Sequence, residues 1–411
     1  MQVWARFVAL FIVHTLYVVH RRLALSTNAI AHDFGLSNAQ LGWFVTAHAT
    51  ALTVSKLLMG ASSDRLQPRM LLIRPLLALG ISSIALSFAT TKNELFAVIV
   101  TSAALQGAAW PVAVGYLQRW FSPGPIGVWF SLMSATTTVG GIMLAFSAAF
   151  YWRAVAFNFG WMSVVIAIVA RLILDDGEKE KEGGEKDEKI NSAPPLLPLL
   201  GWICSRTVVW QVGLLYALAM MTRTIAETWL PLFTLDPSTL QYYFEIGGLL
   251  GSLGSGFLVD ALTRRGMTAE TATRQLTIVA TSAMLVVASS LVLAIADTSS
   301  LPSSLQLSIL SFLSGCLVYS TINLVCLATA EMSAPGDDIG GTLTALVSFM
   351  SQFGSIMAGT PVAVLLQLFG RAALAPLLSS ALVVCGAVAY SNRPFVLPRF
   401  QPITVAEKKK Q

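Results

Sequence analysis

The sequence is a succession of long apolar segments, and this feature restricts its fold more than any other. Twelve segments follow one another with short polar breaks, and each is close to the ~20 residues that span a bilayer as a helix. Charged residues make up 11% of the chain, against roughly 25% in soluble domains. This pattern excludes a soluble enzyme and predicts an all-α membrane protein with twelve transmembrane helices. The predicted spans are residues 4–31, 39–60, 70–89, 94–118, 126–150, 154–174, 205–233, 239–261, 274–296, 303–330, 339–367 and 372–392.

A charged segment divides the twelve spans into two sets of six. It begins DDGEKEKEGGEKDEK at residue 175, and such a high charge without apolar residues is typical of a solvated linker. We therefore expect four parts: a six-helix bundle at residues 1–174, a cytosolic linker at 175–204, a second six-helix bundle at 205–393, and a cytosolic tail at 394–411.

The positions of Lys and Arg predict the orientation in the membrane. Basic residues gather in loops on the side of the N-terminus, whereas Lys92, Arg153 and Arg371 fall on the opposite side. Because basic loops favour the cytosolic side, both termini and the linker are expected in the cytosol. The first apolar run passes into Arg21 and Arg22 without a small-residue cleavage site, so we expect a retained helix and no cleaved signal peptide.

A short motif recurs at matching places in the two halves. GASSDRLQPR follows the second span, and GFLVDALTRR follows the eighth. This indicates an internal repeat, as in transporters built from two bundles, and the motif is predicted to act in gating. An ordinary polar loop is the alternative. The motif residues are Gly60, Asp64, Arg65 and Arg69 in the first half, and Gly256, Asp260, Arg264 and Arg265 in the second.

Four basic residues inside predicted spans are assigned to neither the inner nor the outer side, and each costs about 2.5–3.5 kcal/mol on insertion scales. They are Arg21 and Arg22 in the first span, Lys56 in the second, and Arg223 in the seventh. One mid-span acid, Glu227, is set against these four bases, so pairing is not expected to neutralise them all. A water-filled cavity with an anionic ligand is therefore predicted.

Pseudo-symmetry is expected to bring Arg21 and Arg223 to opposite walls of one central cavity, where two guanidinium groups can bind a phosphate from both sides. A structural salt bridge of Arg223 with Glu227, one turn later, is the alternative. Arg22 points about 100° away from Arg21, which leaves either a supporting role at the site or helix packing. Lys56 adds positive charge toward the inner side, or else snorkels to the boundary.

Other polar and aromatic residues carry weaker signals. Tyr17, Tyr319 and Trp229 could offer rings or hydroxyl groups to a sugar, although aromatic residues in membrane helices usually pack. The four histidines are expected to be hydrogen-bonded packing residues. The four cysteines lie in or beside apolar runs, so neither a disulfide framework nor a metal site is expected. We expect no cofactor, and no nucleic-acid partner because the basic residues are scattered.

Several motifs together resemble the organophosphate:phosphate antiporters of the major facilitator superfamily, and most of all the glucose-6-phosphate transporters. The resemblance implies a major facilitator fold with two pseudo-symmetric bundles. It also implies a central phosphate site at Arg21 and Arg223, with Arg22 and Lys56 at the other basic positions. The motifs are YVVHRRLAL (17–25), LGWFVTAHATALTVSKLLMGASSDRL (41–66), QGAAWPVAVGYLQRWFSP (106–123), TRTIAETW (222–229), FEIGGLLGSLGSGFLVD (244–260) and EMSAPGDDIGGT (331–342).

The resemblance further implies a function without covalent catalysis. The expected activity is exchange of a sugar phosphate, glucose 6-phosphate favoured, for inorganic phosphate by alternating access. The family's acid before Trp229 is Thr228 here, and its Tyr-Gly-Pro is Tyr319 followed by Ser and Thr. Glycerol 3-phosphate or another organophosphate is therefore an alternative substrate. A non-transporting sugar-phosphate sensor is a further alternative, and a proton symporter ranks last.

The last residues of the sequence predict a compartment. Lys408 and Lys409 occupy the fourth and third positions from the end, the form of a dilysine retrieval signal that cytosolic coat proteins read. The endoplasmic reticulum membrane is therefore favoured, with the plastid envelope or plasma membrane as alternatives. A basic tail that only reinforces topology or touches anionic lipid is the other interpretation.

Overall fold

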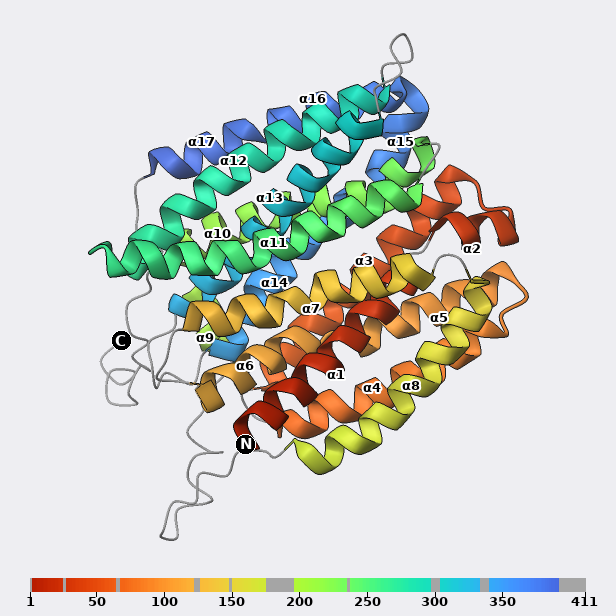
Figure 1. The fold of residues 1–411 in the computed structure, drawn as a ribbon, viewed down its shortest axis with the longest axis horizontal. Helices are drawn as coiled ribbons and strands as arrows, with labels where there is room; N and C mark the ends of the chain where they lie inside the picture. Colours follow the sequence, from red (N-terminus) through yellow and green to blue (C-terminus); the bar gives the residue numbers. More distant parts are fainter. Residues whose placement is uncertain are drawn as a thin grey trace, which may run out of the picture.

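Helices form nearly all of the regular structure in the computed structural model, which has no strand within the described residues. Figure 1 shows the long helices running side by side, with the start of α1 and the end of α17 toward the same end of the bundle. The described residues are 2–24, 27–63, 67–121, 126–147, 150–174, 196–234, 237–296, 304–332 and 340–391.

The first half contains the six predicted spans, of which the fourth is divided into α5 and α6. The short helix α2 is an addition to the prediction. The helices are α1 (Gln2–Ala24), α2 (Thr27–Phe34), α3 (Asn38–Ser63), α4 (Pro68–Ser87), α5 (Lys92–Leu105), α6 (Ala109–Phe121), α7 (Ile126–Ser147) and α8 (Trp152–Ile173).

The second half also contains its six spans, with three of them divided. The elements are α9 (Leu196–Cys204), α10 (Thr207–Thr224), a π-helical turn η1 (Ile225–Trp229), a 3₁₀ turn η2 (Leu230–Phe233), α11 (Pro237–Arg264), α12 (Ala269–Ala296), α13 (Ser304–Glu331), α14 (Gly340–Met357), α15 (Thr360–Phe369), a 3₁₀ turn η3 (Arg371–Ala373), α16 (Leu374–Ser380) and α17 (Leu382–Tyr390).

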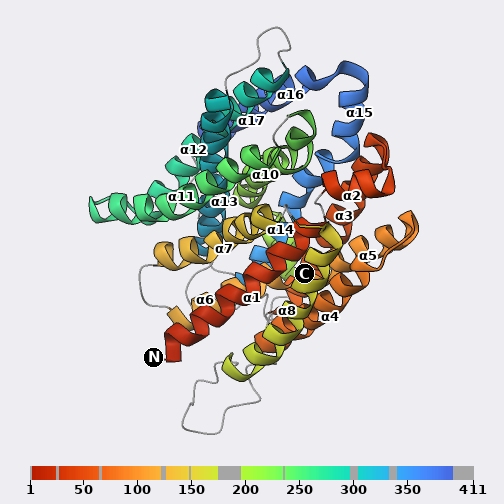
Figure 2. The same cartoon turned by 45° about the vertical axis from the view of Figure 1, so that its right-hand side comes forward.

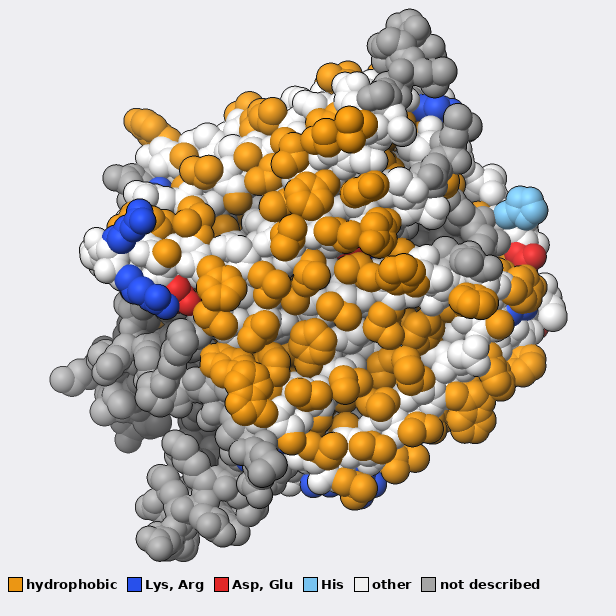
Figure 3. Space-filling view, in the orientation of Figure 1, with side chains coloured by type: hydrophobic (Ala, Val, Ile, Leu, Met, Phe, Trp, Pro, Cys, Tyr) orange, Lys and Arg blue, Asp and Glu red, His pale blue; other side chains and the backbone are white. Residues whose placement is uncertain are grey.

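The helices have the length and surface of membrane spans. Ten helical stretches in the described ranges are long and apolar enough to cross a bilayer. α1 and α3, which carry Arg22 and Lys56, have 23 and 26 residues and so also reach the ~20 that a span needs. Large apolar side chains face outward, Leu172 being 83% exposed, and Figure 3 shows this apolar face with Lys and Arg at its margins. The predicted all-α, multi-pass membrane protein is confirmed.

Two groups of helices correspond to the two halves of the chain, as Figures 1 and 2 show. α3 packs against α14 and α15, and α7 packs against α11, so these helices join the halves. Within the second half, α11 and α13 approach closely because both carry glycine. A Cβ atom on Gly251 would lie 2.0 Å from the Cys316 carbonyl oxygen, and one on Gly315 would lie 1.9 Å from that of Phe244. The glycines are therefore required by backbone packing.

The end of the first span differs from the prediction. The span was expected to reach residue 31, whereas α1 ends at Ala24 and α2 begins at Thr27. Arg21 and Arg22 consequently lie in the last turn of α1 and not in the middle of a longer helix. Cationic side chains interact favourably with the negative end of the helix dipole there.

Two other expected boundaries also need comment. The last residues of the predicted linker form helix α9, whose sequence LLPLLGWIC is apolar, and residues 175–195 lie outside the described part. The second copy of the repeated motif lies within α11 except for Arg265, because this helix continues to Arg264 instead of ending at residue 261. In the first copy, Gly60 is on α3 and Arg69 on α4, while Asp64 and Arg65 are outside the described residues. The gating role stays a prediction.

Candidate functional site

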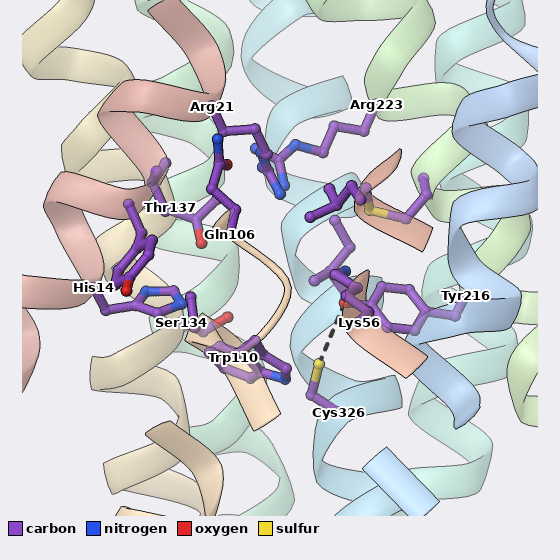
Figure 4. Close-up of a pocket in the computed structure, with 16 residues that line it drawn as sticks. His14, Arg21, Lys56, Gln106, Trp110, Ser134, Thr137, Tyr216, Arg223 and Cys326 are labelled. Atoms are coloured by element: carbon purple, nitrogen blue, oxygen red, sulfur yellow. Dashed lines mark hydrogen bonds between the residues drawn. The ribbon is translucent and has the colours of Figure 1, made fainter. Parts of the chain in front are cut away.

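A cavity lies between the two halves of the protein and is lined by both. α1 and α3 contribute Arg21 and Lys56 from the first half, and α10 contributes Tyr216 and Arg223 from the second. Figure 4 shows the guanidinium groups of Arg21 and Arg223 extending toward one another across this space. The two arginines that sequence symmetry pairs therefore meet in one cavity.

Arg21 and Lys56 have no hydrogen-bond or ion-pair partner among the described residues. Lys56 is nevertheless buried, with 7% of its surface exposed. A buried charge without a counter-charge is costly, so the two side chains favour an anion between the bundles. A phosphate monoester, which carries about −1.5 to −2 at neutral pH, matches their combined charge.

Arg22 belongs to a second cluster of charges, which connects the two bundles. Its guanidinium group pairs with both carboxylate oxygens of Glu245 on α11, the Nη2–Oε2 bond being 3.1 Å, and its Nη2 lies 3.0 Å from Oε1 of Glu227 in η1. Arg223 donates from Nε to the same Glu227 oxygen at 2.6 Å. The hydroxyl group of Tyr319 accepts from Arg22 and donates to Glu227 at 3.1 Å. The two arginines and two glutamates cancel in charge.

This cluster corrects the expected balance of charges. Only Glu227 was expected as an acid within the spans, but Glu245 also lies in a predicted span and is completely buried. Both interpretations of Arg223 hold, since this residue lines the cavity and also pairs with Glu227. Its Nη2 atom has no partner. Two of the four bases are thus neutralised by the protein, and Arg21 and Lys56 are not.

The π-helical turn explains how Glu227 reaches both arginines. The amide of Leu230 donates to the carbonyl of Ile225, five residues earlier. Pro231 follows and has no amide hydrogen to continue the α-helical pattern, so the helix widens before it. Such π turns within helices often occur at functional sites.

Two glycines make room for the charged groups. A Cβ atom on Gly141 of α7 would lie 2.4 Å from Nη1 of Arg22 and 2.5 Å from Cδ of Glu245. Between α5 and α6, a Cβ atom on Gly107 would lie 2.1 Å from Oγ of Ser55 and 2.6 Å from the backbone nitrogen of Lys56. The break between α5 and α6 therefore lets the chain pass directly against α3 where α3 presents Lys56.

We expect Gly107→Ala to destabilise the folded protein by about 1–3 kcal/mol, because the added methyl group meets backbone atoms of α3. Thermal unfolding of the purified protein in detergent measures this as a lower Tm. Gly254→Ala on α11 is the matched control, since nothing lies within 4 Å of its added Cβ atom. Equal unfolding temperatures for both variants would contradict the close packing at Lys56.

The aromatic candidates lie in three different places. Tyr17 lines the cavity, although its hydroxyl group donates to the Leu72 carbonyl at 2.7 Å. Tyr319 lies in the charged cluster, where the guanidinium carbon of Arg223 is 5.0 Å from its ring centre. Trp229 is fully buried and donates to the Ala358 carbonyl at 2.6 Å. Trp229 is not among the residues that line this cavity, and its role at the site stays a prediction.

The histidines divide into partnered and unpartnered side chains. His14 bonds to Thr136 and His20 to Ser163, each at 2.7 Å, as expected for hydrogen-bonded residues, although His14 also lines the cavity. His48 is also buried but makes no hydrogen bond among the described residues, and its Nε2 atom has no partner. Sequence reasoning missed both His48 and Glu245, because each looks like one isolated polar residue in an apolar helix.

Two helical bundles around a buried basic cavity define a membrane carrier of the two-bundle class. A profile of the Major Facilitator Superfamily matches residues 10–359, and the chain belongs to this family. The fold expected from the sequence is thereby confirmed.

Three curated relatives are similar over large parts of the chain. A probable hexose phosphate transport protein of Chlamydia trachomatis serovar D is 24% identical over 86% of this chain and 82% of its own length. The membrane sensor protein UhpC of Escherichia coli K12 is 27% identical over 55% of this chain and 57% of its own length. The phosphoglycerate transporter protein of Salmonella typhimurium is 24% identical over 84% of this chain and 78% of its own length.

Proposed function

We propose that the protein exchanges a phosphorylated sugar or polyol for inorganic phosphate across the membrane, with glucose 6-phosphate the favoured organic substrate. The observation that carries this proposal is the pair of unpartnered cations, Arg21 and Lys56, in one cavity with Arg223. The relatives named for hexose phosphate and phosphoglycerate transport support a phosphate-bearing substrate. No covalent step is required.

Exchange follows from the charges of the cavity. Without an anion, closing the bundles around Arg21 and Lys56 leaves two buried positive charges, whereas a bound phosphate neutralises them. The bundles therefore change face mainly when they are loaded. A phosphate at Arg223 also competes with Glu227, which at the same time pairs with Arg22 of the other bundle. Substrate binding is thus coupled to ion pairs between the halves.

Counterflow into liposomes tests the proposal. Liposomes preloaded with inorganic phosphate should accumulate labelled glucose 6-phosphate, and those without internal phosphate should not. Glycerol 3-phosphate, triose phosphates and phosphoenolpyruvate complete the comparison of substrates. Saturable binding without accumulation would favour the sensor alternative, and one of the relatives is named as a membrane sensor protein. Uptake driven by a pH gradient in the absence of internal phosphate would favour a proton symporter.

The endoplasmic reticulum remains a prediction from the basic residues at 408–410, which lie outside the described part of the chain. Coat proteins are the partners that this motif would bind. Changing Lys408 and Lys409 to Ser in a protein tagged at its N-terminus should release it to later compartments, as seen by fluorescence microscopy. An unchanged distribution would remove the support for this location.

A further inference from the structure

The cavity has two lobes, one on each side of the pair of arginines. Arg21, Leu52, Met220 and Arg223 line both lobes. The Lys56 lobe, shown in Figure 4, extends toward Lys56, Tyr216 and Cys326. The His48 lobe is further lined by Val45, His48, Ala49, Thr224, Glu227, Gln352 and Ser355. His48 precedes Lys56 by eight residues on α3, or about 12 Å along the helix axis, so the lobes lie at different depths.

The two lobes differ in charge. The Lys56 lobe has an unpartnered ammonium group, and its lining among the described residues includes no Asp or Glu. The His48 lobe includes the carboxylate of Glu227 together with the uncharged polar side chains of Thr224, Gln352 and Ser355. Arg21 and Arg223 line both lobes, so the lobes differ by Lys56 on one side and Glu227 on the other. A phosphate is therefore favoured toward Lys56, and a second anionic group meets less positive charge beside Glu227.

Among the residues that line this lobe and not the other, His48 has a buried nitrogen without a partner. Its side chain is 2% exposed, and its Nε2 atom has no hydrogen-bond partner, whereas the other buried histidines, His14 and His20, each have one. Gln352, on the facing helix α14, uses its amide nitrogen on Ser351. An imidazole can donate or accept a hydrogen bond, which suits a hydroxyl group.

Building on the proposed function, we propose that the His48 lobe binds the uncharged, hydroxyl-bearing part of the substrate while the phosphate lies toward Lys56. His48 and Gln352 are then specificity-determining residues. The substrate class is the phosphate monoester of a neutral polyol or sugar. A phosphorylated carboxylic acid is selected against, because its carboxylate would approach Glu227.

Glycerol 3-phosphate and 3-phosphoglycerate provide a matched test, since they share a three-carbon skeleton and differ in a hydroxymethyl or a carboxylate group. Each competes with labelled inorganic phosphate for the purified full-length protein in detergent. We expect glycerol 3-phosphate to compete at least about tenfold better. His48→Leu should weaken glycerol 3-phosphate about tenfold and change phosphate affinity less than about threefold, because phosphate alone does not need the lobe. His48→Gln should retain most of the preference for glycerol 3-phosphate over 3-phosphoglycerate.

His20→Leu is the control, because it removes another buried histidine that lines neither lobe. The inference is overturned, with the proposed function intact, if 3-phosphoglycerate competes as well as glycerol 3-phosphate in the wild-type protein. It is equally overturned if His48→Leu weakens phosphate and glycerol 3-phosphate by the same factor. If the wild-type protein binds no phosphate, both the inference and the proposed function fail. Should His48→Leu not fold, Gln352→Leu must show the same selective loss.

Discussion

Replacing Arg21 with alanine should reduce phosphate exchange at least about a hundredfold, which corresponds to about 2.7 kcal/mol of lost interaction. Arg21 is one of two cavity cations without a protein partner, so its charge is available to the substrate. The initial rate of labelled phosphate uptake into phosphate-loaded proteoliposomes measures the effect. Arg21→Lys should also be slow, because lysine keeps the charge but cannot present two parallel donors to a phosphate.

Arg171→Ala is the matched control for this experiment. Arg171 is exposed near the end of α8, does not line the cavity, and should be replaceable without loss of exchange. Normal exchange by Arg21→Ala would contradict the assignment of the central cation. Loss of exchange in both variants would point to a general loss of folded protein, which the amount of monodisperse protein after purification identifies.

Replacing Glu245 with alanine should have the second largest effect, and this effect should be on stability. Removing one partner of a buried ion pair costs about 3–5 kcal/mol, reduced here because Glu227 still faces Arg22. The double variant Arg22→Met with Glu245→Leu should be more stable than Glu245→Ala, because neither charge is then left alone. Thermal unfolding of the purified proteins measures both effects.

The double variant also separates stability from transport. It should fold but exchange phosphate slowly, since Glu227 then pairs with Arg223 alone and the link between α1 and α11 is lost. A double variant less stable than Glu245→Ala would contradict the pairing of Arg22 with Glu245.

Much of the fold could be predicted because bilayer thickness imposes a length on each helix. The predicted spans match the observed helices within a few residues in most cases, although Arg21 and Arg22 lie at the end of α1 and not in mid-span. The end of α1 was placed too late because residues 23–31 carry no charge, although the last of them belong to the separate helix α2. The division of the fourth span at Gly107 depends on contact with α3, which sequence periodicity does not contain.

The sequence predicted a basic cavity between the two halves, but it did not predict which acids form ion pairs with the arginines. Helix geometry separates Arg21 from Arg22 by about 100°, which is consistent with one facing the cavity and the other facing α11. Which acid meets Arg22 depends on how the two bundles dock, so Glu245 could not be chosen from the sequence without that arrangement. The same holds for His48, whose importance comes from lacking a partner in the folded structure.

The dependence of phosphate efflux on external phosphate tests the central claim most directly. Liposomes that contain the purified protein and labelled phosphate are diluted into buffer with or without unlabelled phosphate, and the release of label is followed. The charges of the cavity predict rapid release only when external phosphate is present, since an empty cavity with two unneutralised cations changes face slowly. Release at the same rate in both buffers would contradict coupled exchange and with it the role of Arg21 and Lys56.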